Sequence, residues 1–185
     1  MPVVCIGVDP SSRKLAAVMC VVGNEPSVKF TTKAIPVDKP TSCLLAFEWM
    51  RTLVELHQSQ GDVYVFVELP VLGRGGPGST IPQAQVNGAL LAGAQMAGAE
   101  VIPVNNSHVK KDVIGRGNAN KDDIKQLVKE AWPKLYEQIS KDQDLCDSAM
   151  IYMYGKNVIK RRDRIAAAKT LSSIKIKRRG KVTDN

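Results

Sequence analysis

The stretch VVCIGVDPSS, residues 3–12, decides how the first part of the chain folds. Its apolar residues are typical of a buried strand, the strand ends in the acidic residue Asp9, and Pro10 and the two serines after it indicate a turn. Two further runs that favour strands follow at residues 15–22 and 28–37, separated by a turn that contains Gly and Pro. Because short turns connect neighbouring strands that run in opposite directions, the sequence predicts a three-stranded antiparallel meander.

The rest of the chain predicts helices that alternate with two more strands. Apolar residues recur at helical spacing after Pro40, whereas VYVFV at residues 63–67 is a short apolar run typical of a buried strand. Residues 69–82 contain four glycines and three prolines and indicate a long loop. After this loop we expect a helix over 82–98, a strand over 100–104, helices over 105–114 and 121–131, and a last helix over 142–159.

This order of elements predicts the fold class. Three strands are followed by helix, strand, helix, strand and three helices, which indicates an α/β domain with one core, in which helices flank a five-stranded mixed sheet. The sequence contains no internal repeat and no linker long enough to separate two domains. We therefore expect one domain over residues 1–159 and a basic C-terminal tail over residues 160–185.

The net charge of +8 is concentrated towards the C-terminal end. Residues 1–155 carry 15 Lys and Arg against 16 Asp and Glu, a net charge of −1, whereas residues 156–185 carry 11 against 2, a net charge of +9. A nearly neutral body with a basic tail favours a polyanionic partner, nucleic acid first. The alternative is a tail that only keeps the protein in solution.

Composition argues against several other classes of protein. No apolar run reaches the roughly 18 residues of a membrane helix, and the start of the chain shows no signal-peptide pattern, so we expect a cytoplasmic protein without a membrane partner. The four cysteines form no CxxC pair and only two histidines are present, which argues against a zinc ribbon and a multi-histidine metal site. GRGGPG at residues 73–78 lacks the GxxxxGK[ST] pattern, so no nucleotide cofactor is expected.

Two acidic residues stand where predicted buried strands end. Asp9 closes the first strand, and Glu68 directly follows the strand at residues 63–67. An acid is costly in apolar surroundings unless it is compensated, and the ends of strands are where the sites of α/β proteins lie. Taken alone, each acid favours a structural role, either capping a turn or pairing with Arg13 or Arg74.

A second acidic pair, Asp144 and Asp147, stands three residues apart at the start of the last helix, which places both carboxylates on one helix face. Acids at this position also complement the helix dipole, and Asp142 is expected to be the N-cap. Together, the four carboxylates form the oxygen ligand set that Mg²⁺ and Mn²⁺ prefer. Two such ions, about 3.5–4 Å apart, activate water and stabilise the leaving oxygen in phosphodiester cleavage.

Five motifs in order give the chain a resemblance to a known family. They are IGVDPSS at residues 6–12, VE at 67–68, QVNGA at 85–89, VKKDVIGRGNANK at 109–121 and DLCDSA at 144–149. Over residues 3 to about 155 the chain resembles the RuvC Holliday-junction resolvases of the ribonuclease H-like (retroviral integrase) superfamily. Two departures, Ser11 in place of a glycine and an additional Ser148 before Ala149, leave all four acids in place.

The resemblance implies a ribonuclease H-like fold and a two-metal active site. By it, Asp9, Glu68, Asp144 and Asp147 are catalytic and hold two Mg²⁺ ions, for which Mn²⁺ substitutes, and Lys121 is catalytic at the scissile phosphate. The resolvases carry a junction-probing aromatic shortly after the strand-four Glu, and residues 69–72 contain none. Either the apolar Val71 or Leu72 takes its place, or discrimination for four-way junctions is weak. The expected DNA contacts are Lys110, with Lys111 as its alternative, Arg74, Val71, Leu72, Arg116, Lys160, Arg161 and Arg162.

These features predict an endonuclease that resolves four-way DNA junctions by paired symmetric nicks. The resemblance implies a homodimer formed through the helix over residues 82–98, in a bacterial or phage-infected cell. One alternative is a broader nuclease that cuts forks, flaps or RNA–DNA hybrids. Another is a non-catalytic junction-binding protein, against which the retention of all four acids argues.

Overall fold

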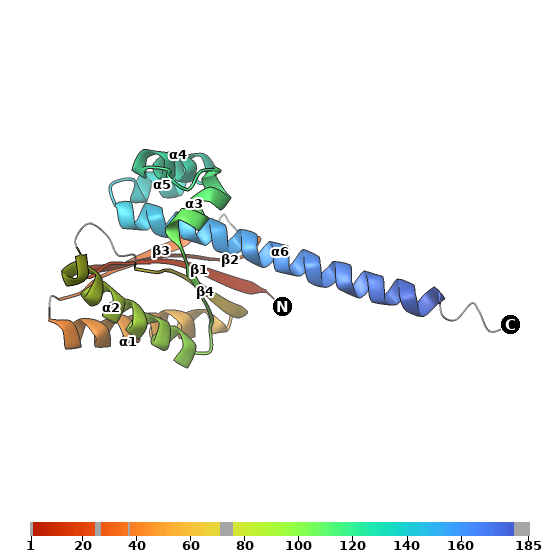
Figure 1. Cartoon of the computed structure of the whole chain (residues 1–185), viewed down its shortest axis with the longest axis horizontal. Helices are drawn as coiled ribbons and strands as arrows, with labels where there is room; N and C mark the ends of the chain where they lie inside the picture. The colour runs from red at the N-terminus through yellow and green to blue at the C-terminus, as the bar shows by residue number, and fades with distance from the viewer. Residues whose placement is uncertain (1, 25–26, 37, 71–75, 180–185) are drawn as a thin grey trace. The chain divides into compact units, whose positions relative to one another are not determined.

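The computed structural model describes residues 2–24, 27–36, 38–70 and 76–179. Its elements follow in the order β1 (Val3–Pro10), β2 (Lys14–Val21), β3 (Lys29–Ala34), α1 (Lys39–Gln58), β4 (Asp62–Glu68), α2 (Gly76–Met96), β5 (Glu100–Val104), α3 (Asn106–Ile114), α4 (Lys121–Ala131), α5 (Pro133–Ile139) and α6 (Gln143–Arg179). The chain divides into two compact units, residues 1–155 and 156–185, and the first holds the sheet and the helices that cover it (Figure 1).

β1 is the central strand of a five-stranded sheet with the order β3-β2-β1-β4-β5. β1, β2 and β3 pair antiparallel, which confirms the predicted meander. β4 and β5 run parallel to β1, because α1 and α2 return the chain to the same end of the sheet before each of these strands. The predicted mixed α/β fold is therefore confirmed.

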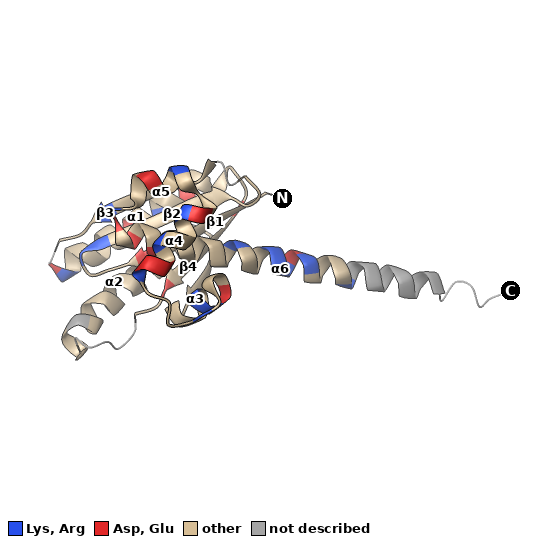
Figure 2. Cartoon of the chain, turned by 90° about the horizontal axis from the view of Figure 1, so that it is seen from above, with Lys and Arg blue, Asp and Glu red and all other residues tan. Residues whose placement is uncertain are grey.

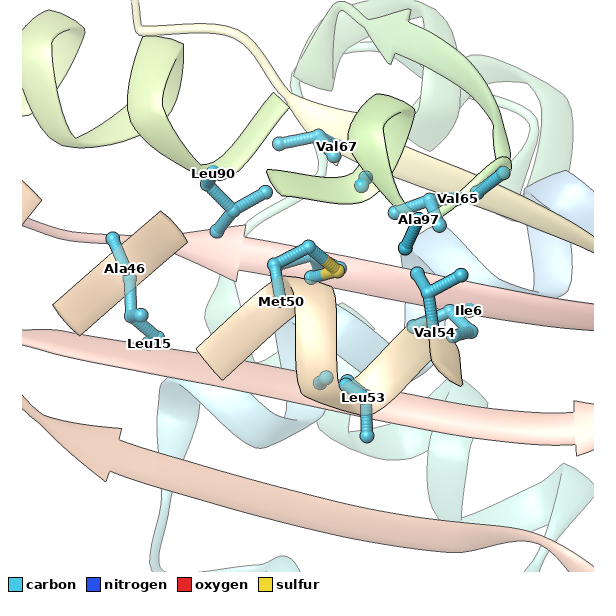
Figure 3. Close-up of a cluster of buried hydrophobic side chains, with 14 of the residues drawn as sticks. Ile6, Leu15, Ala46, Met50, Leu53, Val54, Val65, Val67, Leu90 and Ala97 are labelled. Atoms are coloured by element: carbon cyan, nitrogen blue, oxygen red, sulfur yellow. The ribbon is translucent and has the colours of Figure 1, made fainter. Parts of the chain in front are cut away.

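The main hydrophobic core lies between one face of the sheet and the helices α1 and α2 (Figure 3). Alternate residues of β1, among them Ile6 and Val8, point into this core, as the two-residue period of a strand requires. Met50 of α1 and Leu90 of α2 are completely buried against them. The alternate residues Cys5, Gly7 and Asp9 consequently face the opposite side of the sheet.

The first turns of α6 cover that opposite side. The α6 backbone comes so close to β1 that a Cβ atom on Gly7 would lie 2.3 Å from the backbone nitrogen of Tyr152. The Cys5 thiol contacts the Tyr152 carbonyl at 3.8 Å, and the Phe66 ring of β4 packs edge-on against Tyr154. Gly7 therefore permits the close approach that fixes α6 next to the end of β1.

The structure differs from the sequence-based boundaries in three places. Pro133 begins an additional short helix, α5, because proline suits the first turn of a helix. α2 begins at Gly76, so part of the predicted loop is helical, and Pro82 lies inside the helix, where it removes one hydrogen bond without ending it. α6 continues to Arg179 instead of ending at residue 159, since the Ala, Lys and Arg residues that follow favour helix.

Candidate active site

Asp9 and Glu68 stand at the ends of neighbouring parallel strands. β1 and β4 are in register with Val8 opposite Val67, so the next residue along each strand is one of the two acids. Val8 and Val67 point into the core beneath α1 and α2. Because side chains alternate along a strand, Asp9 and Glu68 point to the face that α6 covers.

α6 brings the second acidic pair to the same place. Asp142 caps this helix as predicted, since its Oδ1 accepts a hydrogen bond from the Leu145 backbone N–H at 3.3 Å. The completely buried Ser148 hydroxyl accepts from the Asp9 backbone N–H at 3.2 Å and donates to the Asp144 carbonyl at 2.8 Å. Ser148, which sequence comparison presents only as an additional residue, therefore joins the end of β1 to the start of α6.

The four carboxylates influence one another electrostatically. Burial raises the pKa of Asp9 well above its ordinary value, and the charges of Glu68, Asp147 and Asp144 raise it further. Burial also raises the pKa of Glu68 and the pKa of Asp147. Crowded, buried like charges of this kind are relieved when a cation binds, and they are typical of functional sites.

Three neighbouring side chains hold individual carboxylates, and none of them was predicted from the sequence. The Asn106 amide Nδ2 donates to Glu68 Oε1 at 2.8 Å, and the Gln143 Nε2 donates to Asp147 Oδ1 at 3.0 Å. Lys14 Nζ lies 2.8 Å from Asp144 Oδ2. Asn106 and Gln143 are the first residues of α3 and α6, and an amide at a helix start gives no sequence signal that distinguishes a site residue from an ordinary one.

α2 supports the strand ends from the other side of the sheet. The buried Asn87 donates to the Glu68 carbonyl at 2.7 Å, and Gln83 donates to the Pro10 carbonyl at 3.1 Å. Both bonds fix the backbone next to an acidic residue. The QVNGA motif therefore contributes Asn87 to positioning, whereas its Gln85 is exposed.

The donor atoms suit a hard divalent cation, although the side chains are not arranged around one. Carboxylate oxygens are the preferred ligands of Mg²⁺ and Mn²⁺, and the Asn106 Oδ1 atom is buried without a hydrogen-bond partner among the described residues. Within the described part of the chain, no three His, Cys, Asp or Glu side chains stand close enough to hold an ion. Metal binding therefore requires carboxylates to turn towards one another.

Two of the lysines named by the sequence lie near the acids. The positive charge of Lys110 lowers the pKa of Glu68 and of Asp147, and that of Lys121 acts on Asp147. Lys111, the alternative to Lys110, is exposed, and Arg116 forms an ion pair with Asp123. Lys110, which is half-buried, is therefore the lysine of this pair whose charge acts on two of the acids.

The remaining predicted DNA contacts belong to the second compact unit or lie outside the described residues. Lys160, Arg161 and Arg162 belong to the second compact unit and are exposed. Figure 2 shows Lys and Arg recurring along α6. Val71, Leu72 and Arg74 lie outside the described residues. Within the described residues, no helix combines the length and the apolar character that crossing a bilayer requires.

The chain is similar to known proteins in both sequence and structure. The model of the family described as "Crossover junction endodeoxyribonuclease RuvC" matches residues 5–152. A search of curated proteins found no match.

Among solved structures, the chain is similar to Thermus thermophilus RuvC, with 20% identity and a TM-score of 0.60 over 82% of this chain and 92% of that one. It is similar to T. thermophilus RuvC in complex with a Holliday junction substrate, with 18% identity and a TM-score of 0.59 over 82% and 91%. The yeast mitochondrial Holliday junction resolvase Ydc2 matches with 11% identity and a TM-score of 0.58 over 89% and 85%.

These structural similarities confirm the fold, and the family model covers the strands, the helices and the motifs from which the four acids project. The chain therefore belongs to the RuvC family of crossover junction endodeoxyribonucleases.

Proposed function

We propose that this enzyme cuts four-way DNA junctions by metal-dependent hydrolysis, with Asp9, Glu68, Asp144 and Asp147 as the ligands of two Mg²⁺ ions. The main support is that the acids of β4 and α6 lie near enough to Asp9 of β1 for their charges to raise its pKa. Four such carboxylates are unfavourable without a cation and well suited to one. The RuvC family, one of whose members is solved with a Holliday junction, supports the choice of substrate.

The chain's own residues position the reaction. When bound, the ions supply an activated water and stabilise the charge on the leaving oxygen. Asp9 and Glu68 stand on strand ends whose backbone is held by Ser148 and Asn87, so the backbone of two of the proposed ligands is in place before substrate arrives. Lys121, at the start of α4, and Lys110 place positive charge beside the acids, where a scissile phosphate would gain negative charge.

Paired nicks require two copies of the site, and we propose that α2 forms the interface between them. Its outward side carries Gly88 and Ala92, both exposed, between Ile81, which is 54% exposed, and Met96, which is 74% exposed. Small residues permit close approach, and the two large apolar side chains would be covered in a two-fold dimer. The exposed Lys160, Arg161 and Arg162 are proposed as contacts to DNA phosphates.

The site assignment is tested by the variants Glu68→Gln and Asp147→Asn. Each keeps the size of its side chain and removes a negative charge, so we expect Mg²⁺-dependent cleavage of a four-way junction to fall by more than about 100-fold. Binding of the same junction, measured with Ca²⁺ in place of Mg²⁺, is expected to persist, because phosphate contacts remain.

Asp62→Asn is the matched control, because Asp62 is an exposed acid at the opposite end of β4. It should cut at the wild-type rate. Near-normal cleavage by Glu68→Gln or Asp147→Asn would show that these acids do not hold catalytic ions.

A further inference from the structure

Lys14 forms an ion pair with Asp144, one of the proposed metal ligands. It is the first residue of β2, and its Nζ lies 2.8 Å from Asp144 Oδ2 and 2.7 Å from Asp142 Oδ1. The Ser11 hydroxyl accepts from the Lys14 backbone N–H at 2.9 Å and donates to its carbonyl at 2.8 Å. The lysine backbone is therefore fixed beside the turn that follows Asp9.

The three groups of this cluster are half-buried, which strengthens their attraction relative to a fully exposed ion pair. Lysine is protonated at neutral pH, so the Lys14 ammonium donates to Asp142 Oδ1 and pairs with Asp144 Oδ2 as a full positive charge. Lys14 thus provides part of the positive charge that the four acids require.

Asp144 differs from the other proposed ligands in this respect. Among the ion pairs of the described residues, none involves Asp9, Glu68 or Asp147, whereas Asp144 is paired with Lys14. The Asp144 Oδ2 atom, 2.8 Å from an ammonium, is engaged in this ion pair, and the described acids do not form a group able to hold an ion. A divalent ion that takes Asp144 as a ligand therefore competes with this ammonium for the charge of the same carboxylate, and Asp142 remains available to hold Lys14.

We propose that Lys14 competes with the divalent cation for Asp144, and so lowers the metal affinity of the site while stabilising the metal-free enzyme. Asp142 is the residue that retains Lys14 when Asp144 turns to the ion. This inference rests on the proposed function, in which Asp144 is a metal ligand. It assigns to Lys14 a positioning role and no contact with the substrate.

The test is Mg²⁺ titration calorimetry on the full chain without DNA, with thermal unfolding in EDTA as the second readout. Lys14→Met keeps the length of the stem and removes the charge. We expect it to bind Mg²⁺ about 3–10-fold more tightly, because a competing ion pair is lost. In EDTA it should unfold about 2–4 °C below the wild type, since the acids lose their internal cation.

Arg13→Met is the matched control, because it removes the same charge from the exposed neighbouring residue. It should change neither the Mg²⁺ affinity nor the unfolding temperature. If Lys14→Met binds Mg²⁺ no more tightly than Arg13→Met does, the proposed competition is wrong.

Asp142→Asn provides an independent measurement, because Asn also caps helices well while it releases the ammonium. We expect this variant to weaken Mg²⁺ binding when Lys14 is present and to have a much smaller effect in the Lys14→Met background. Equal effects in both backgrounds would overturn the role of Asp142.

Asp9→Asn distinguishes failure of this inference from failure of the proposed function. If Asp9→Asn leaves Mg²⁺ binding unchanged, the four-acid metal site itself is wrong. If Asp9→Asn loses Mg²⁺ binding while Lys14→Met has no effect on it, only the proposed competition is refuted.

Discussion

At the scale of single residues, the site consists of acids whose charge the fold does not fully compensate. Asp9 illustrates this, because it lies at the end of a buried strand, close to three other carboxylates. Asn106 and Gln143 each donate one hydrogen bond to an acid, which reduces the cost of its charge without removing it. Cys146, between Asp144 and Asp147, is completely buried, and burial raises its pKa to about 11, so it behaves as a packed apolar residue, as expected.

The raised pKa of Asp9 makes the stability of the metal-free protein depend on pH. Its carboxyl binds a proton more tightly in the folded state than in the unfolded chain, where the pKa is near 3.8. Stability due to this residue is therefore highest at acidic pH, falls as the pH rises through the window above 3.8, and stays low once the folded carboxyl is ionised.

Asp9→Asn should remove this penalty. In EDTA at pH 7–8 we expect the variant to be more stable than the wild type by about 0.5–2 kcal/mol, with the difference shrinking below about pH 4. Urea unfolding across this range measures it, and Mg²⁺ should stabilise the wild type but not the variant. A variant less stable than the wild type at neutral pH would contradict the account of Asp9.

At the scale of elements, one side of α2 packs against α1 and the opposite side is exposed. Gly93 faces α1, where an added Cβ would lie 2.3 Å from the Phe47 carbonyl oxygen. Ala92, the next residue, is exposed. The helix that the resemblance assigned to a dimer interface thus has two different sides, and Gly93 belongs to the packing within the chain.

Substitutions at these two neighbouring positions should therefore have different effects. Ala92→Trp should separate the proposed dimer with little change in unfolding, because its side chain projects outward. Gly93→Ala should instead lower stability by about 1–3 kcal/mol or more, because the α1 backbone cannot give way easily. Sedimentation and urea unfolding distinguish the two effects. A wild-type monomer, or an unchanged dimer in Ala92→Trp, would refute the α2 interface.

At the scale of the whole molecule, sequence predicted the order of the five strands, every helix except α5, and the carboxylates that the structure brings together. Alternation and helical spacing are local patterns, so β1 to β5 were recognised, and the acids stood out because they interrupt apolar runs. Lys14, Asn106 and Ser148 were not identified as site residues, because each acts on an acid distant in sequence. Their roles depend on how α3 and α6 pack against the sheet, and a local sequence pattern does not predict this packing.

The central claim is that the enzyme acts on four-way junctions and needs a divalent ion. The most direct measurement compares three substrates labelled on each strand, a four-way DNA junction, a replication fork and an RNA–DNA hybrid, each with Mg²⁺ and with EDTA. We predict symmetric nicks in two opposed strands of the junction, only with Mg²⁺, and little cleavage of the hybrid. Equal cleavage of junction and fork would indicate the broader branched-DNA nuclease, and junction binding without any Mg²⁺-dependent cleavage would contradict the account.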